Sequence, residues 1–153
     1  MLASPGRFFE KFQKIDKMYR RFYQYELAEY QFTPNEIAVI LFLHNNSPEL
    51  DTATDIVRCK GISKGLVARS VDSLFAKGYL ETVREPSDRR IVHLKLSEKS
   101  LPITERISVK QKEMARNIER GISQEELRIT SETLDKLLIN TELLLKGREN
   151  HAE

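Results

Sequence analysis

The residues of this sequence that suggest a chemical role are basic, and they gather in one stretch. Between Arg58 and Lys95 there are nine basic and four acidic residues, a net charge of +5. The whole chain of 153 residues carries only +2, so the remainder sums to −3. A positive field confined to one segment is what a surface that binds a polyanion requires. The charge pattern therefore favours a nucleic acid as the partner.

A helix predicted to begin at Ser63 carries the first group of candidate contacts. Val67, Val71 and Leu74 fall on one face of this helix, which leaves small and basic side chains on the other. Small residues allow close approach to a major groove about 12 Å wide, and an arginine can donate two hydrogen bonds to one base. The expected contacts with DNA from this helix are Ser63, Lys64, Gly65, Ala68, Arg69 and Ser73.

A polar break between two alternating stretches carries the second group. Apolar and polar residues alternate around Leu80 and again around Leu94, which predicts a β-hairpin with a basic tip. Arginines at such a tip suit a narrow minor groove, where the negative potential is enhanced. Asp88 is close enough to Arg90 in sequence to hold that side chain extended by a charge-assisted hydrogen bond. The expected contacts from this hairpin are Arg84, Asp88, Arg89 and Arg90.

Charged residues on an exposed helix usually serve only solubility. That explanation is weaker here because of the order in which the elements follow one another. A short helix starts near Thr52, a turn falls at Gly61, a second helix starts at Ser63, and a basic hairpin comes next. This is the order of a winged helix-turn-helix, so the sequence predicts binding to double-stranded DNA.

A serine hydrolase is the enzymatic alternative. Gly61-Ile62-Ser63-Lys64-Gly65 matches the G-x-S-x-G nucleophile elbow, in which the serine directly follows a buried strand. Residues 55–60 instead have the pattern of the end of an amphipathic helix, and His93 falls in a predicted hairpin strand. A hydrolase that uses Ser63 is therefore much the weaker interpretation, and we expect that the protein is not an enzyme.

Metal and cofactor sites have little support in the sequence. His44, His93 and His151 lie far apart, and Cys59 is the only cysteine, whereas metal sites need several ligands at close spacing. A glycine-rich phosphate loop is also missing from the sequence. We therefore expect no metal and no cofactor. We expect Cys59 to be a small packed side chain at a helix end rather than a redox switch.

The apolar runs are too short for a membrane protein. The longest, Ile37 to Leu43, falls well below the roughly 20 residues that span a bilayer. A single cysteine suits a reducing compartment. These features predict a cytoplasmic protein with no membrane partner.

Helical periodicity and turn residues predict six helices and one hairpin. The expected helices run from Phe8 to about Tyr30, from Thr33 to about Asn45, from Thr52 to before Gly61, from Ser63 to Gly78, from Ser97 or Pro102 to Arg120, and from Ser123 to about Lys146. The predicted fold class is mainly α with a small β-hairpin wing, a winged helix-turn-helix plus a helical dimerisation region.

The last predicted helix carries more apolar surface than a small core can cover. Leu127, Leu134, Leu138 and Leu145 follow a heptad-like spacing, here called the leucine seam, with Leu137 and Leu144 beside it. A seam this wide requires a partner. One interpretation is a second copy of the chain; the other is a helical protein-interaction module that binds a different protein and has no specific affinity for DNA.

The motifs resemble those of the multiple-antibiotic-resistance regulator (MarR) family of winged-helix repressors. The resemblance is carried by Ile62 to Leu74, Lys77-Gly78-Tyr79-Leu80, Arg84, Asp88-Arg89-Arg90 and Leu94-Lys95-Leu96-Ser97. It implies a homodimer with interleaved terminal helices that binds a palindromic operator. It also implies that the helix from Ser63 enters the major groove and that the wing enters the minor groove.

The same resemblance suggests three segments and a regulatory ligand. The segments are a dimerisation helix over residues 1–30, a winged helix-turn-helix over 31–96 and dimerisation helices over 97–153. A small aromatic ligand is expected to release the repressor from DNA by changing the distance between the two recognition helices. The candidate pocket wall consists of Tyr19, Phe22, Tyr23 and Phe42, which would serve equally well as plain dimer core.

Overall fold

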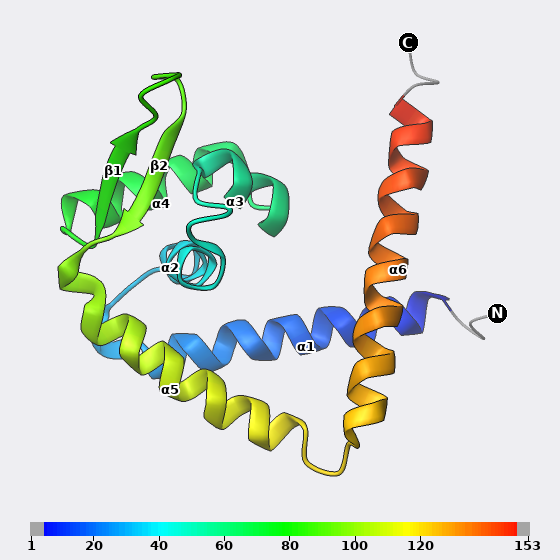
Figure 1. The fold of residues 1–153 in the computed structure, drawn as a ribbon. Helices are drawn as coiled ribbons and strands as arrows, with labels where there is room; N and C mark the ends of the chain where they lie inside the picture. The colour runs from blue at the N-terminus through cyan, green and yellow to red at the C-terminus, as the bar shows by residue number, and fades with distance from the viewer. Residues whose placement is uncertain (1–4, 150–153) are drawn as a thin grey trace. The chain divides into compact units, whose positions relative to one another are not determined.

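The computed structural model describes residues 5–149 and consists of helices with one antiparallel hairpin (Figure 1). The elements are α1 (Pro5–Glu26), a 3-10 turn (Ala28–Tyr30), α2 (Pro34–Asn46), α3 (Ala53–Lys60), α4 (Lys64–Ala76), β1 (Leu80–Arg84), β2 (Val92–Leu96), a second 3-10 turn (Glu98–Ser100), α5 (Leu101–Ile118) and α6 (Gln124–Glu149). The predicted class, mainly α with a small β-hairpin wing, is confirmed. Among the described residues, no helix is both long and apolar enough to cross a bilayer.

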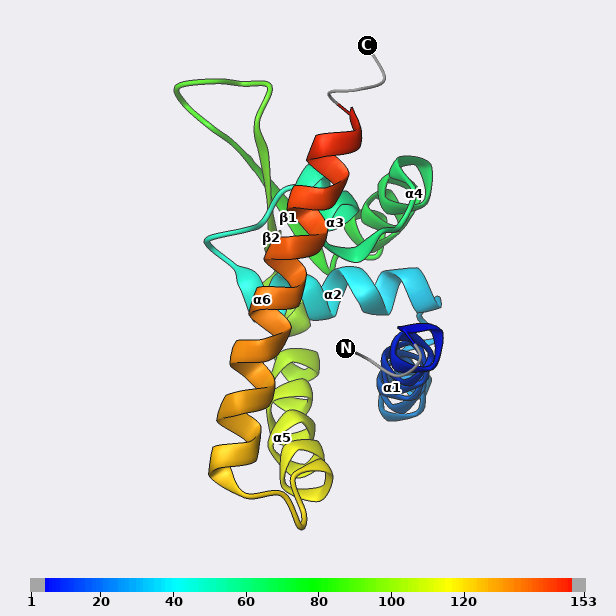
Figure 2. The ribbon, with the colours of Figure 1, turned by 90° about the vertical axis from the view of Figure 1, so that its right-hand side faces the viewer.

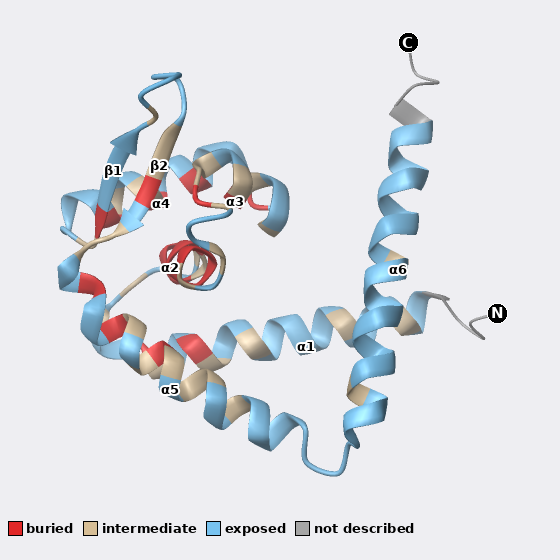
Figure 3. Cartoon of the chain, in the orientation of Figure 1, coloured by how far each residue is buried: buried red, intermediate tan, exposed pale blue. Residues whose placement is uncertain are grey.

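The chain divides into two compact units, Met1–Lys110 and Gln111–Glu153. The core of the first unit is built around α2, which carries seven of the buried residues, more than any other element (Figure 3). Ile37, Val39, Ile40 and Phe42 on this helix are all buried, so α2 is apolar on nearly every side. A helix of that composition is stable only when other elements surround it, and α1, α3, α4 and β2 all pack against it.

Side-chain caps fix where the helices of the winged unit begin. Thr33 and Glu36 form a capping box at α2, and Thr52 and Asp55 form another at α3, so each satisfies two backbone donors that the helix leaves unpaired. Ser63 caps α4 by accepting a hydrogen bond from the Leu66 amide. These three predicted helix starts are confirmed.

In the hairpin, β1 and β2 pair so that Leu80 lies opposite Leu96 and Arg84 lies opposite Val92. Leu80 and Leu94 are buried at its base, while the residues of its tip are exposed. The Leu94 amide also donates to the Asp51 carbonyl at 2.8 Å, which joins β2 to the segment before α3. From this base the hairpin extends away from the helices of its unit (Figure 2). We call residues 80–96 the wing.

Two local predictions need correction, and the structure decides a third that was left open. α1 ends at Glu26 rather than near Tyr30, because the chain turns through a 3-10 segment and Gln31 adopts a left-handed conformation with φ 52°. Cys59 is exposed rather than packed, because α3 turns that side toward solvent. Of the two predicted starts of the next helix, the structure has the later: α5 begins at Leu101, and Pro102 lies in its first turn, where a missing N–H costs nothing.

The second unit contains α6, which follows a capping box at the predicted helix start, Ser123. The Ser123 amide donates to a Glu126 carboxylate oxygen at 2.8 Å, and the Glu126 amide donates back to the Ser123 hydroxyl at 3.2 Å. The leucine seam is largely unburied within this chain: Leu134, Leu138 and Leu145 are exposed, and Leu127 is half-buried.

Candidate nucleic-acid interface

The helix α4 separates a buried face from an open one. Val67 and Leu74 are buried as expected, but Val71 is only half-buried, and Ser70 takes a place on the inner face. Its hydroxyl donates to the Leu66 carbonyl at 2.9 Å, which explains how a serine is tolerated there. The opposite face exposes Ser63, Lys64, Gly65, Ala68 and Arg69.

The first turn of α4 leaves room for a partner. A Cβ added at Gly65 would meet no atom of the described chain within 4 Å, so the space in front of this residue is open. The N-terminal end of a helix carries a partial positive charge and exposed amide donors. This turn therefore combines open surface with donors that suit a phosphate.

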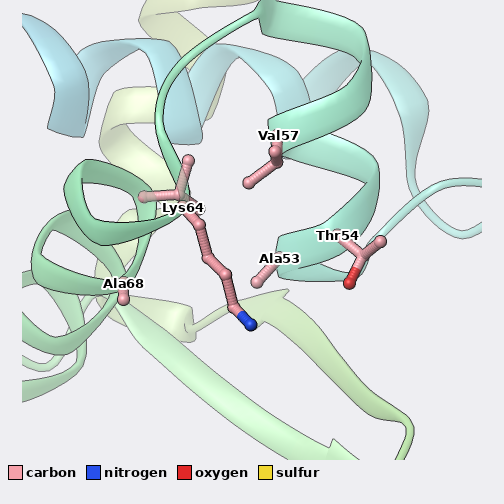
Figure 4. Close-up of a pocket in the computed structure, with 6 residues that line it drawn as sticks. Ala53, Thr54, Val57, Lys64 and Ala68 are labelled. Atoms are coloured by element: carbon pink, nitrogen blue, oxygen red, sulfur yellow. The ribbon is translucent and has the colours of Figure 1, made fainter. Parts of the chain in front are cut away.

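Arg69 and Lys64 supply the side-chain charge of this face. The Arg69 Nε donates to the Gly65 carbonyl at 3.3 Å, which holds the side chain along the helix. Lys64 runs along an apolar cavity of about 250 Å³ between α3 and α4, with its amino end toward Ala53 (Figure 4). Both charged groups thus lie on the surface that the first two turns of α4 present.

Hydrogen bonds within the chain shape the wing tip. Arg84 donates from Nη1 to the Arg89 carbonyl at 3.1 Å, which closes the tip across the hairpin. Asp88 accepts from the backbone amide of Arg90 at 3.0 Å. The expectation that Asp88 holds the Arg90 side chain is therefore wrong, because the carboxylate is used to turn the backbone. The side chains of Arg89 and Arg90 are exposed.

Ser73 differs from the other candidate contacts on α4. It is half-buried, and its hydroxyl donates to Glu36 Oε1 at 2.6 Å. Lys77 Nζ lies 2.6 Å from the same oxygen, and the Thr33 amide donates to the other carboxylate oxygen at 2.7 Å. Glu36 thus joins the start of α2 to α4. The sequence did not indicate this role of Glu36, because a contact across 37 residues leaves no local pattern.

The environment of Glu36 favours its charged form. Burial by itself would raise the pKa of this carboxyl, since only 1% of the residue is exposed. The hydrogen bonds from Lys77, Ser73 and Thr33 outweigh that effect and lower the pKa. The carboxylate is therefore ionised near neutral pH and holds three donors in fixed positions.

His93 is a second residue whose side-chain contacts the sequence did not indicate, although its place in a hairpin strand was predicted. It lies on β2 with Nδ1 2.6 Å from Asp51 Oδ1 and Nε2 3.2 Å from Glu85 Oε2. The hydrogen bond with Asp51 raises the pKa of the imidazole, and the bond with Glu85 acts in the same direction. This residue connects the wing to the segment that precedes α3.

The four aromatic residues proposed as a pocket wall lie in packed surroundings. Tyr23 and Phe42 are buried, whereas Tyr19 and Phe22 are half-buried. The Tyr23 ring lies 5.0 Å from that of Tyr19 and 5.2 Å from that of Phe22, in edge-to-face geometry. These contacts describe an aromatic cluster on α1, and they do not by themselves require a ligand.

The context of Ser63 does not suit a nucleophile elbow. A short loop separates Ser63 from the end of α3, and the two strands of residues 5–149 both come later in the chain. The Ser63 hydroxyl accepts a hydrogen bond as a helix cap. Within the described residues there is also no group of three or more His, Cys, Asp or Glu side chains that could hold a metal ion; His151 lies outside them.

Residues 30–91, from the end of the first 3-10 turn to the tip of the wing, match the family model described as MarR family. This match places residues 30–91 in the MarR family. A crystal structure of Streptococcus pneumoniae FabT in complex with DNA is similar to this chain at 25% identity and a TM-score of 0.64. The similarity covers 92% of this chain and 99% of that one.

Two further solved structures share the MarR fold at lower identity. One is the transcriptional regulator PA3341, with 20% identity, a TM-score of 0.78, and coverage of 88% of this chain and 98% of the other. The second is S. aureus MepR in a DNA-binding conformation, with 17% identity, a TM-score of 0.76, and coverage of 88% and 98%. Because each covers 88% of this chain, these similarities extend beyond residues 30–91, which the family model matches.

Proposed function

We propose that this MarR-family chain is a transcription regulator that binds specific double-stranded DNA as a homodimer. The observation that carries the proposal is the open face at the start of α4, where Lys64 and Arg69 flank the small residues Gly65 and Ala68. Beside it on the same winged unit stands a hairpin with an exposed arginine tip. The structure of FabT in complex with DNA supports this use of the fold.

In this proposal the two basic elements have different tasks. The start of α4 enters a major groove, where Arg69 reads a base and the helix end binds phosphate. The wing enters the adjacent minor groove, where Arg89 and Arg90 follow the negative potential. Two of the proposed residues act indirectly: Asp88 shapes the turn of the wing, and Ser73 holds α4 through its hydrogen bond to Glu36. The full set proposed for the interface is Ser63, Lys64, Gly65, Ala68, Arg69, Ser73, Arg84, Asp88, Arg89 and Arg90.

The second copy of the chain is proposed to cover the apolar side chains that the terminal helices leave exposed. On α6 these include Leu138 and Leu145, and on α1 they include Ile15 and Met18. We accordingly assign residues 1–30 and 97–153 to dimerisation and residues 31–96 to DNA binding. A two-fold dimer fits a palindromic operator when its recognition helices lie about 34–36 Å apart.

Regulation in this proposal is repression relieved by a small aromatic ligand. A ligand that binds one dimer geometry better than the other changes the spacing of the recognition helices and thereby releases DNA. Tyr19, Phe22, Tyr23 and Phe42 are the proposed wall of its site. We propose no enzymatic activity, and we place the protein in the cytoplasm, where a bacterial-type repressor meets its operator.

Selection of bound duplexes from random DNA tests the proposal most directly. Enriched fragments should contain a palindrome, and their affinity should fall steeply between 50 and 200 mM salt, by about 10³-fold or more if six phosphates are contacted. Random DNA should bind far more weakly. Failure to enrich any sequence, with no salt-dependent binding to duplex DNA, would contradict the proposal and favour the alternative of a helical protein-interaction module that uses the leucine seam.

A further inference from the structure

His93 occupies the junction at which the wing leaves the winged unit. Its backbone forms a bridge with Thr52, and the next residue, Leu94, donates its amide to the Asp51 carbonyl. Its side chain faces Asp51 on one side and Glu85, the first residue beyond β1, on the other. One imidazole therefore contacts both the wing and the start of α3.

The two contacts of the ring constrain its protonation state. Carboxylate oxygens accept hydrogen bonds and cannot donate them. A neutral imidazole has one N–H and can satisfy one of the two carboxylates, whereas an imidazolium has two and satisfies both. With Nδ1 2.6 Å from Asp51 and Nε2 3.2 Å from Glu85, the observed geometry fits the charged ring.

We propose that His93, when protonated, is a positioning residue that ties the wing to the start of α3, so that the arginine tip loses its fixed position as the pH rises. The consequence for DNA rests on the proposed function, because it requires that the wing contacts DNA. His93 does not itself touch DNA in this proposal; it acts through Glu85 on the hairpin that carries Arg89 and Arg90.

Within residues 5–149, the other charged groups near His93 make no hydrogen bond or ion pair with its ring. Asp55, at the start of α3, accepts hydrogen bonds from Thr52 and Arg58. On α2, which packs against β2, Glu36 binds Lys77 and His44 lies beside Ser108. Arg84 donates to the Arg89 carbonyl, and Lys95 lies two residues further along β2. Asp51 and Glu85 are therefore the groups that set the charge of the ring.

The direction of the pH effect follows from the pKa of His93. The hydrogen bond with Asp51 raises this pKa above its usual value of about 6.5. A group whose pKa is raised in the folded state contributes its stabilisation fully below the unfolded value and loses it as the pH rises through the folded value. The contact with both carboxylates is thus complete below about pH 6.5 and is lost as the pH rises through the raised pKa of His93. The neutral ring keeps the shorter contact with Asp51 and turns a lone pair toward Glu85.

The contacts of the His93 ring with Asp51 and Glu85 can be tested on the free protein by NMR. We expect the imidazole of His93 to titrate above pH 6.5, and the hairpin amide of Glu85, which donates to the Ile91 carbonyl, to exchange faster once the ring is neutral. After correction for the intrinsic pH dependence of exchange, the exchange rate of the Glu85 amide should rise about two- to fivefold, as expected for loss of a partly exposed ion pair.

Three variants serve as comparisons. His93→Gln should show no such step in the exchange rate, and Asp51→Asn should lower the pKa of His93. His44→Gln, in which the histidine beside Ser108 is replaced, should behave as the wild type.

The effect on DNA is measured as affinity for a selected duplex across the same pH range. Wild type should bind about two- to fivefold more weakly once His93 is neutral. Loss of one positive charge would by itself weaken binding to DNA, and Glu85→Gln separates the two causes. This variant keeps the titrating ring but removes the charged partner, so the step in affinity should shrink to the part that the charge of the ring itself causes.

Three results would overturn the inference. The first is a pKa of His93 at or below 6.5. The second is an exchange rate of the Glu85 amide that shows no step as His93 titrates. The third is a pH-dependent change in DNA affinity that is as large in Glu85→Gln as in the wild type. If the protein binds no DNA at any pH, the proposed function fails instead, and the hairpin exchange of the free protein still decides whether His93 holds the wing.

Discussion

Lys77 at the end of α4 and Glu36 at the start of α2 form an ion pair of 2.6 Å whose two ends differ in exposure. The Glu36 side chain is 2% exposed and the Lys77 side chain is 40% exposed. Without its partner, Lys77 can turn into water, whereas the carboxylate cannot. The pair therefore holds the end of α4 against α2, because the buried carboxylate has no access to water in place of Lys77.

Lys77→Met should destabilise the protein more than Glu36→Gln. The first change leaves a buried carboxylate short of a donor and is expected to cost about 1–3 kcal/mol in the free energy of unfolding by urea. The double variant should be more stable than Lys77→Met alone, because it removes the unpaired charge. Lys112→Met, at an exposed position of α5, serves as the control and should change little. Equal losses in both single variants would contradict this account.

The contribution of Lys77 should also depend on pH. The lowered pKa of Glu36 means that the pair stabilises the fold above the usual value near 4.5 and ceases to do so as the pH falls through the folded value. The difference in unfolding free energy between wild type and Lys77→Met should therefore shrink when the pH is lowered from 7 toward 4. A difference that stays constant over this range would show that Glu36 is not the group involved.

Arg69→Ala tests whether α4 reads sequence. If Arg69 contacts a base, binding to the selected duplex should weaken by about 1–3 kcal/mol, while binding to random DNA falls much less. Arg120→Ala removes an exposed arginine outside the proposed interface and should affect both duplexes slightly and alike. Equal losses of binding free energy on selected and random DNA would indicate that Arg69 contacts a phosphate rather than a base.

Arg90→Ala tests the wing separately. Narrow minor grooves occur in A·T-rich DNA, so the loss of affinity should be larger for duplexes with A·T-rich flanks than for duplexes with G·C-rich flanks. The comparison uses the same central palindrome in both duplexes and fluorescence anisotropy at one salt concentration. Indifference to the flanking sequence would argue against a minor-groove contact by this residue.

Leu138→Glu with Leu145→Glu tests assembly. Both leucines are exposed in the single chain, and charges there would oppose burial against a second copy. Sedimentation should change from dimer to monomer, while circular dichroism stays helical. Lys136→Glu, which lies off the leucine seam on the same helix, should remain dimeric. Removal of all residues after Gly121 is expected to abolish the dimer and lower solubility, and a truncated chain that still sediments as a dimer would overturn the assignment.

Local chemistry predicted much of this fold, because its signals lie within a few residues of one another. Thr33, Thr52 and Ser63 mark helix starts, and Gly78, with φ 80°, follows the end of α4. The relationships that position the interface are long-range: Ser73 meets Glu36 across 37 residues, and His93 meets Asp51 across 42. Such contacts appear only once the helices are packed. The placement of the DNA contacts themselves stays a prediction.

The last prediction concerns ligand control. A small aromatic acid or phenol that binds near α1 can release DNA only if it binds the two dimer geometries with different affinity. We expect at least one such compound to dissociate the selected duplex, and Tyr19→Ala to weaken that compound's binding. Tyr19 is the suitable probe because it is half-buried, whereas truncation of the buried Tyr23 would cost about 3–5 kcal/mol through the cavity it leaves. Phe22→Ala gives a second, half-buried test on the same helix, and Tyr25→Ala, at an exposed position of α1, is the control. A compound that releases DNA equally well from folded Tyr19→Ala and Phe22→Ala variants would place its site elsewhere. If no compound of this class releases the duplex, ligand control through the aromatic cluster is wrong, and the amount of protein alone would set the occupancy of its operator.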